Sequence, residues 1–329
     1  MNAYLVLQDG TVFKGKSFGY EGEAAGEVVF TTSMVGYLET LTDPSYYGQV
    51  VVQTFPLIGN YGIIPSDFEG PRIGCAAYVV KEWCAVPSNF RSEGDLDAFL
   101  KEHKIVGLCD IDTRALTRII REKGVMSGSI TTNPKAVAVE CEICVEAVSA
   151  DKSYSEGQGK YNVALMDFGV KKSIKQELIN RDCKVNVFPA KTSAEELLAS
   201  NPDGIVLSNG PGDPAVNMEI IAEIKKLKAS GVPIFGIGLG HQLMALASGL
   251  KTQKLLYGHR GSNQPVKEKE TGRVYITNQN HGYIVNCDNP WLVNANDGTC
   301  EGIMYDDKTM TVQFDPDADL FDRFVLLLK

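Results

Sequence analysis

The sequence predicts two α/β domains in succession, the first of mixed α/β type and the second a largely parallel sheet covered by helices. Its 329 residues suit two domains. A polar stretch rich in glycine and serine, SADKSYSEGQGK at 149–160, divides the chain near its middle. After this stretch, short apolar runs alternate with amphipathic segments, as they do in parallel sheets. We therefore expect domains at 1–148 and 161–329, joined by a linker at 149–160.

The first half combines short β-rich segments with one clear helical pattern. Apolar residues fall on one face of a helix expected over Asp112–Lys123. This combination indicates a mixed α/β domain. The expected strands are Tyr4–Leu7, Glu27–Thr32 and Gln49–Thr54.

The second half alternates strands with helices. Thr192 and Glu195 predict a capping-box start for one helix, and Gly231 with Pro233 predicts the end of another. Ligands in such sheets bind beyond the carboxyl ends of the strands. The expected strands are Val163–Met166, Lys184–Phe188, Gly204–Leu207 and Ile234–Ile237. The expected helices are Lys171–Asn180, Ser193–Ala199, one through Ile220 and Leu227, and His241–Ser248.

Composition excludes several classes of function. The net charge of −9 argues against a nucleic-acid groove or a basic membrane-binding face. No apolar run approaches the ~20 residues that span a bilayer, and the N-terminal apolar run meets Asp9 before it could form a signal peptide. We expect a cytoplasmic protein with no nucleic-acid or membrane partner.

The eight cysteines are expected to be reduced. Cys141 and Cys144 form a CxxC pair, which could be redox-active or half of a metal site. No second CxxC and no nearby histidine accompany it, so we interpret it as an incidental pair on a helix and predict no metal site.

Four segments carry chemical information. In Leu207–Pro214 (LSNGPGDP) a strand ends in a glycine-rich turn whose N–H groups can bind an anion. Phe235–Gln242 (FGIGLGHQ) has the form of a nucleophile elbow, with Gly238 at the nucleophile position. The third and fourth segments are Asn278–Ile284 (NQNHGYI) and Gln313–Asp317 (QFDPD).

Together these four segments resemble the class I glutamine amidotransferases, whose elbow reads G-x-C-x-G-x-Q and whose late H-P-E supplies a base and its orienting acid. The resemblance implies a class I glutamine-amidotransferase-like fold for the second domain. Further segments resemble the small-subunit family of carbamoyl phosphate synthetases, almost from end to end of the chain. They are Thr32–Tyr37, Leu41–Tyr46, Phe55–Gly62, Asp110–Leu116 and Asp167–Lys171.

The resemblance also implies a glutamine pocket. Leu239, which follows the elbow residue, would supply one oxyanion-hole N–H, and Ser45 would come from the first domain, placing the pocket at the domain interface. His281 is interpreted as a hydrogen-bonded pocket histidine, because no nucleophile is present for it to activate. The pocket residues implied are Ser45, Gly210, Gly212, Leu239, Gln242, Asn280, Gly282 and Tyr283.

The triad positions depart from the family. Gly238, Asp315 and Asp317 stand where the resemblance implies cysteine, histidine and glutamate. Glycine cannot form the thioester intermediate, and a carboxyl group with a pKa near ~4 is a poor base at neutral pH. Asp315 and Asp317 could be paired carboxylates for acid–base work, but we interpret them as a solvated acidic turn. The Ser-Pro-Gly-containing loop that follows H-P-E in the family is expected to be deleted.

Two further expectations concern the missing thiol. Gly238 should adopt the unfavourable elbow dihedrals freely, because it has no side chain. Cys287 and Cys300 lie in the same half of the chain as the elbow, but neither lies on an elbow itself. We therefore do not expect either to replace the nucleophile.

The resemblance implies the following function. In the intact family the small subunit releases ammonia from glutamine, and a large subunit combines the ammonia with bicarbonate and ATP. We expect a small subunit of the arginine and pyrimidine pathways that cannot hydrolyse glutamine, with a large synthetase subunit and L-glutamine as partners. No cofactor is expected in this chain, since ATP and magnesium would belong to the large subunit. The alternatives are a stand-alone glutamine-binding pseudoenzyme with a regulatory role and a degenerate paralogue.

Overall fold

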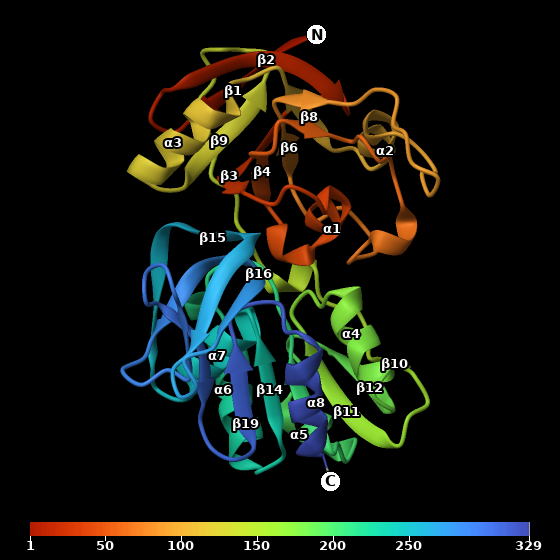
Figure 1. The fold of residues 1–329 in the computed structure, drawn as a ribbon, viewed down its shortest axis with the longest axis vertical. Coiled ribbons are helices and arrows are strands. Elements are labelled where there is room, and N and C mark those ends of the chain that lie inside the picture. The colour runs from red at the N-terminus through yellow and green to blue at the C-terminus, as the bar shows by residue number, and fades with distance from the viewer. Residues whose placement is uncertain (329) are drawn as a thin grey trace. The chain divides into compact units, whose positions relative to one another are not determined.

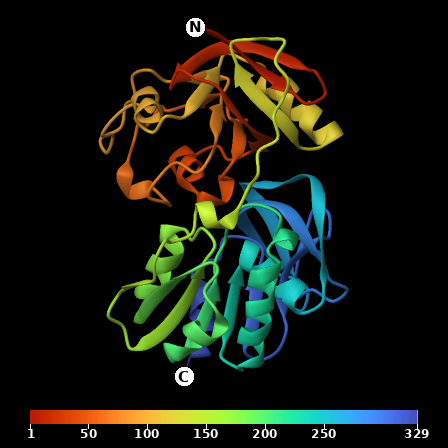
Figure 2. The ribbon, with the colours of Figure 1, turned by 180° about the vertical axis from the view of Figure 1, so that it is seen from behind.

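A computed structural model describes residues 1–328 of the chain. These residues form two compact units, Met1–Ile143 and a second unit that begins at Cys144 (Figures 1 and 2). Each unit has its own hydrophobic core, so each is described separately.

The first unit contains a closed barrel with the strand order β1-β2-β8-β6-β4-β3-β9. The prediction of a mixed α/β domain is consistent with it, but closure was not predicted. Closure requires β1 to pair with both β2 and the distant β9, and such pairing leaves no local pattern in the sequence. The barrel strands are β1 (Asn2–Leu7), β2 (Val12–Gly19), β3 (Ala24–Thr31), β4 (Gln49–Gln53), β6 (Ala77–Val79), β8 (Val106–Cys109) and β9 (Met126–Thr131).

Short helices pack on this barrel. Asp112 accepts a hydrogen bond from the N–H of Ala115 and caps α3, which confirms the helix expected there. The helices are α1 (Tyr37–Thr42), α2 (Leu96–Glu102) and α3 (Thr113–Lys123), with the 3-10 turns η1 (Pro44–Tyr46) and η2 (Pro65–Asp67). A small separate pair is formed by β5 (Leu57–Ile58) and β7 (Glu82–Trp83).

The second unit is built on a ten-stranded sheet with the order β10-β12-β11-β13-β14-β19-β18-β16-β15-β17. Strands β12, β11, β13, β14 and β19 run parallel, which confirms the largely parallel sheet. They are β11 (Tyr161–Asp167), β12 (Cys183–Pro189), β13 (Gly204–Leu207), β14 (Ile234–Ile237) and β19 (Thr309–Val312). The antiparallel strands are β10 (Tyr154–Glu156), β15 (Lys251–Glu268), β16 (Val274–Asn286), β17 (Leu292–Asn294) and β18 (Cys300–Met304).

Helices cover both faces of this sheet. Alternate residues of β11 point to opposite faces of the sheet. Leu165 packs in the core with α4 and α8 on one face, and Met166 packs in the core with α5, α6 and α7 on the other. Figure 1 shows α4 and α8 in front of the sheet, and Figure 2 shows the opposite side. The helices are α4 (Lys172–Ile179), α5 (Ala194–Ala199), α6 (Met218–Ala229), α7 (Leu239–Ala247) and α8 (Ala318–Leu326), with 3-10 turns η3 (Val145–Ala147) and η4 (Pro214–Val216).

The expected linker at 149–160 is not a free connection. It contains β10, which pairs antiparallel with β12, and the N–H of Ala150 donates to Asp167 at 2.8 Å. Its polar composition suggested a linker because an edge strand exposed on one side also carries polar residues. The second unit accordingly begins at Cys144, earlier than residue 149.

Two local expectations differ from the structure. The cap of α5 is Ser193, whose hydroxyl accepts from the N–H of Glu196 at 3.2 Å, so the capping residue lies one position later than Thr192. Cys141 lies in a segment without helix and Cys144 precedes η3, so this pair is not on a helix. All eight cysteines are free thiols. Within residues 1–328, no helix combines the length and apolar character needed to cross a membrane.

Candidate functional site

The loops that follow four neighbouring parallel strands meet at one edge of the second unit's sheet. The strands are β11, β13, β14 and β19. Hydrogen bonds join their loops: the N–H of Lys171 donates to Asn209 Oδ1 at 3.2 Å, and Asn209 Nδ2 donates to the carbonyl of Gly169 at 2.9 Å. The N–H of Gly238 donates to the carbonyl of Val312 at 2.9 Å. This edge is therefore the expected ligand-binding position of a parallel sheet.

Gly238 forms the sharp turn between β14 and α7. Its backbone has φ 56° and ψ −109°, which confirms the expected elbow conformation. A Cβ atom here would lie 3.4 Å from Asn209 Cβ, an ordinary contact. The turn therefore has room for a side chain, and the obstacle to one is the backbone conformation.

Asp315 is held in place by two side chains. Its Oδ2 atom lies 2.7 Å from Lys171 Nζ and accepts from Asn278 Nδ2 at 2.5 Å. Only 7% of the Lys171 side chain is exposed. The prediction of a solvated turn is therefore wrong for Asp315, because a lysine far earlier in the sequence packs against it.

Asp317 is exposed, as expected for a solvated turn. It also has a structural role that we did not predict: its Oδ1 accepts from the N–H of Leu320 at 3.2 Å and caps α8. The helix starts directly after it, so only Gln313–Asp317 connects β19 to α8.

Hydrogen bonds connect the predicted pocket residues Gln242 and Tyr283. Gln242 Nε2 donates to the carbonyl of Tyr283 and to Gln313 Oε1, both at 3.0 Å. His281 Nδ1 donates to the same Tyr283 carbonyl at 2.9 Å. Burial lowers the pKa of His281 well below its usual value, so the ring is neutral. It is the hydrogen-bonded histidine that we expected.

The predicted pocket glycines lie where backbone or side chains approach closely. A Cβ on Gly210 would lie 2.2 Å from the carbonyl oxygen of Phe168 and 2.9 Å from Leu239 Cδ2. Gly212 has φ 90°, which favours glycine. In β16, Gly282 lies against Arg260. Gly210 and Leu239 are thus neighbours, but their contact with glutamine stays a prediction.

Asn280 and Ser45 complete the predicted set. Asn280 lies in β16 and pairs in register with Arg260 of β15. Ser45 lies in η1 of the first unit, where its N–H donates to Asp43 Oδ1 at 2.8 Å. The part of each in a glutamine pocket stays a prediction.

A charged network beside His281, with His259 and Glu301 buried and Asp297 exposed, escaped the sequence analysis. His259 Nε2 lies 2.9 Å from Asp297 Oδ2, and its Nδ1 lies 3.5 Å from Glu301 Oε1, which also accepts from Asn294 at 3.0 Å. Desolvation lowers the pKa of His259, but Glu301 and Asp297 outweigh it and raise the pKa overall. Donor atoms of His259, His281 and Glu301 lie within 4.8 Å of one another and could hold a metal ion. The two carboxylates favour the protonated form of His259, and their contacts with it account for the same geometry without a metal.

The second unit is a class I glutamine amidotransferase domain. Its characteristic features are the glycine-rich turn after β13, the elbow between β14 and α7, and strand β16. The family model for glutamine amidotransferase class-I matches residues 164–322. The model for the CPSase domain of the carbamoyl-phosphate synthase small chain matches residues 5–130. The chain belongs to the carbamoyl phosphate synthase small chain family.

Full-length relatives support this assignment. The chain is 47% identical to the carbamoyl phosphate synthase pyrimidine-specific small chain of Halalkalibacterium halodurans, over 100% of this chain and 98% of that protein. It is 48% identical to the carbamoyl phosphate synthase small chain of Clostridium perfringens, over 97% of this chain and 95% of that protein. The first alignment has 357 positions against the 329 residues of this chain, a difference of 28.

Proposed function

We propose that this chain is a carbamoyl phosphate synthetase small subunit that does not hydrolyse glutamine and supports a large subunit that uses free ammonia. The observation that carries the proposal is Gly238 at the elbow, with φ 56° and no side chain. The proposed setting is the cytoplasm and the arginine and pyrimidine pathways. ATP and magnesium would bind to the large subunit.

The chemistry of the family requires a thiol at the elbow. A thiolate attacks the glutamine amide carbon, ammonia leaves as a thioester forms, and water then releases glutamate and regenerates the thiol. A base must take the proton from the thiol and give one to the leaving ammonia. Gly238 offers no thiol, and the carboxylate of Asp315 is paired with Lys171 at 2.7 Å. The attack therefore lacks its thiol, and the proton transfer lacks its base.

Cys287 and Cys300 do not replace the nucleophile. Cys300 is buried, and burial raises the pKa of its thiol to about 12, so the reactive thiolate is not populated at neutral pH. Cys287 lies in the turn after β16, away from any strand-to-helix elbow. These facts support a chain without glutaminase activity.

The pocket residues support retained glutamine binding. Gln242, Tyr283 and His281 share one hydrogen-bonded group, and the missing thiol adds space beside Asn209. We propose that L-glutamine binds weakly without turnover and that Ser45 takes part in binding it. Calorimetry at millimolar glutamine should detect binding that Ser45→Ala weakens. No heat, or identical behaviour of the two proteins, would contradict this part of the proposal.

The first unit supports the proposed partnership. Full-length identity near 47% includes this unit, although the triad positions have changed. We propose that its surface still binds the large subunit.

The decisive experiment combines the chain with its cognate large subunit. The two should co-purify at micromolar concentration, and the complex should form carbamoyl phosphate from ammonium but not from glutamine. The small chain of Clostridium perfringens assembled with its own large subunit serves as the comparison. Glutamate release above background by this chain would refute the loss of glutaminase activity. Failure to associate would favour a stand-alone glutamine-binding pseudoenzyme if glutamine binds, and a degenerate paralogue if it does not.

A further inference from the structure

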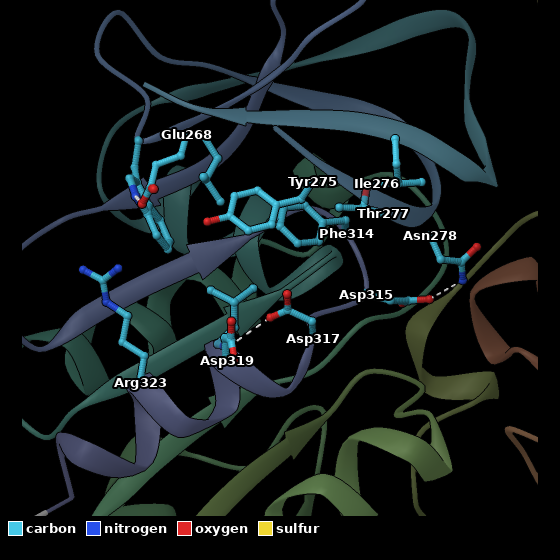
Figure 3. Close-up of a pocket in the computed structure, with 13 residues that line it drawn as sticks. Glu268, Tyr275, Ile276, Thr277, Asn278, Phe314, Asp315, Asp317, Asp319 and Arg323 are labelled. Carbon is cyan, nitrogen blue, oxygen red and sulfur yellow. Dashed lines mark hydrogen bonds between the residues drawn. The ribbon is translucent and has the colours of Figure 1, made fainter. Parts of the chain in front are cut away.

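The short connection between β19 and α8 leaves a cavity on the second unit. The cavity has a volume of about 200 Å³. Figure 3 shows Tyr275 and Phe314 in its centre, with Asp317 and Asp319 on the helix side and Asp315 toward one end. An apolar cavity of about 150 Å³ can hold a benzene ring, so this one can receive a small organic molecule.

The middle of the cavity is apolar. Phe314 is buried, and Tyr275 and Leu320 are half-buried beside it. These three side chains come from β16, the β19–α8 connection and α8. They offer a ring or a short alkyl chain a surface that excludes water, which favours binding of an apolar body.

At one end of the cavity, the charged side chains of Glu268 and Arg323 already have partners within the protein. Glu268 Oε1 accepts from Trp291 Nε1 at 2.9 Å, and its other oxygen accepts from Thr271 at 2.6 Å. The Arg323 guanidinium lies 4.7 Å from the centre of the Trp291 ring. The hydrogen bonds from Thr271 and Trp291, and to a smaller extent the nearby Arg323 charge, lower the pKa of Glu268. We therefore do not expect this end of the cavity to bind the charged group of a ligand.

The helix side carries negative charge that lacks a counter-ion. Asp317 uses Oδ1 to cap α8, and Asp319 lies in the first turn of the same helix. Within residues 1–328, neither of these carboxylates forms an ion pair. They already occupy the helix end that attracts anions, so this side repels an anionic ligand and attracts a cation.

We propose that this cavity binds a small organic cation, a protonated amine carried on an aromatic or alkyl body. The body lies against Tyr275, Phe314 and Leu320, and the ammonium group lies at Asp317 and Asp319. The site includes Asp317, one of the proposed triad positions, but neither Gly238 nor the predicted glutamine-pocket residues line it, so amine binding is measured separately from glutamine hydrolysis.

The test uses the intact chain and three probes of similar shape: phenethylamine, 2-phenylethanol and 3-phenylpropanoate. Titration by calorimetry or NMR at low salt should give the order cation, neutral alcohol, anion, and added salt should weaken only the amine. Equal affinity for the amine and the alcohol would show an apolar hollow without charge selection. No binding of the amine at millimolar concentration would also overturn the proposal.

Variants locate the site. Asp317→Asn combined with Asp319→Asn keeps a helix-capping side chain and should weaken amine binding about fivefold or more. Asp288→Asn removes an exposed carboxylate that does not line the cavity and should leave the affinity unchanged. Leu320→Trp should fill the cavity and block the amine and the alcohol alike. If Asp288→Asn weakened binding as much as the double variant, the amine would be responding to net charge alone.

Discussion

Lys171 and Asp315 stand 144 residues apart in the sequence, and Lys171 Nζ lies 2.7 Å from Asp315 Oδ2. The pair sits at the position where the family resemblance implies the catalytic base. A buried ammonium group requires a partner, because removal of charge from water is costly. Asp315 therefore has a structural role, as the partner of a buried lysine.

Asp315→Asn should destabilise the second unit, because it removes the carboxylate that pairs with the buried Lys171 ammonium group. The expected loss of unfolding free energy is about 1–3 kcal/mol. Denaturant unfolding of the purified variant would measure it. Asp322→Asn is a control on an exposed carboxylate that pairs with Arg181; Arg181 keeps a second partner in Glu177, so the loss should stay below about 1 kcal/mol. Lys171→Met added to Asp315→Asn should restore part of the stability. Equal losses for Asp315→Asn and Asp322→Asn would show that the Lys171 pair behaves like a surface contact.

Gly238→Ala should also destabilise the fold, through the backbone alone. The new Cβ would have ordinary contacts, but φ 56° with ψ −109° disfavours a side chain, at about 1–3 kcal/mol. Gly231→Ala, at φ 74° with open space around it, is the comparison and should cost about 1 kcal/mol. A smaller loss at Gly238 than at Gly231 would mean that the elbow relaxes and carries no particular strain.

Acid should destabilise the second unit through its neutral buried histidines. Burial lowers the pKa of His241 from 6.5 to about 3 and lowers that of His281 as well. For a lowered pKa the unfolded state binds the proton first, so this stability is present above pH 6.5 and is lost as the pH falls toward 3. The raised pKa of His259 acts in the opposite direction: its contribution is present below pH 6.5 and is lost as the pH rises through the raised value.

His241→Gln isolates one of these histidines. Between pH 7.5 and pH 5 the wild type should lose ~2 kcal/mol more unfolding free energy than this variant. His103→Gln changes an exposed histidine and should follow the wild type. Urea unfolding at the two pH values gives the comparison. The same pH dependence in all three proteins would show that His241 accepts a proton without unfolding.

Local patterns were enough to predict the parallel half of the fold. The strand over Gly204–Leu207 and the elbow at Gly238 are determined by residues close together in the sequence. The structure therefore confirms both predictions. Closure of the first unit's barrel depends on β1 meeting β9, which no local pattern encodes.

The same distinction applies to the site. The motifs that contain the proposed triad positions could be found in the sequence, because each motif lies within one loop; their assignment to a triad stays a prediction. The interpretation of Asp315 failed because its partner Lys171 belongs to another loop. The network of His259, Asp297 and Glu301 was missed for the same reason, since its members come from separate strands and turns.

Restoring the triad should recover glutaminase activity only in part. Gly238→Cys returns a thiol to the elbow, but a thiol with a pKa near ~8.5 is only a few per cent thiolate at neutral pH. Asp315 is paired with Lys171, so no imidazolium stands at that position to lower the pKa of the new thiol. The single variant should therefore release almost no glutamate, since catalytic groups that act as a unit recover little one at a time.

The triple variant Gly238→Cys, Asp315→His, Asp317→Glu should release glutamate at least about 100-fold faster than Gly238→Cys alone, because it regains a general base. It should still remain well below an intact relative. Asp315→His removes the counter-ion of Lys171, and the short connection to α8 leaves the new imidazole without the missing loop; a displacement of about 1 Å can cost ~100-fold. Glutamate release by wild type, single and triple variants under one set of conditions is the measurement. If Gly238→Cys alone reached the rate of the Clostridium perfringens small chain, Asp315 and Asp317 would not mark a lost base and acid.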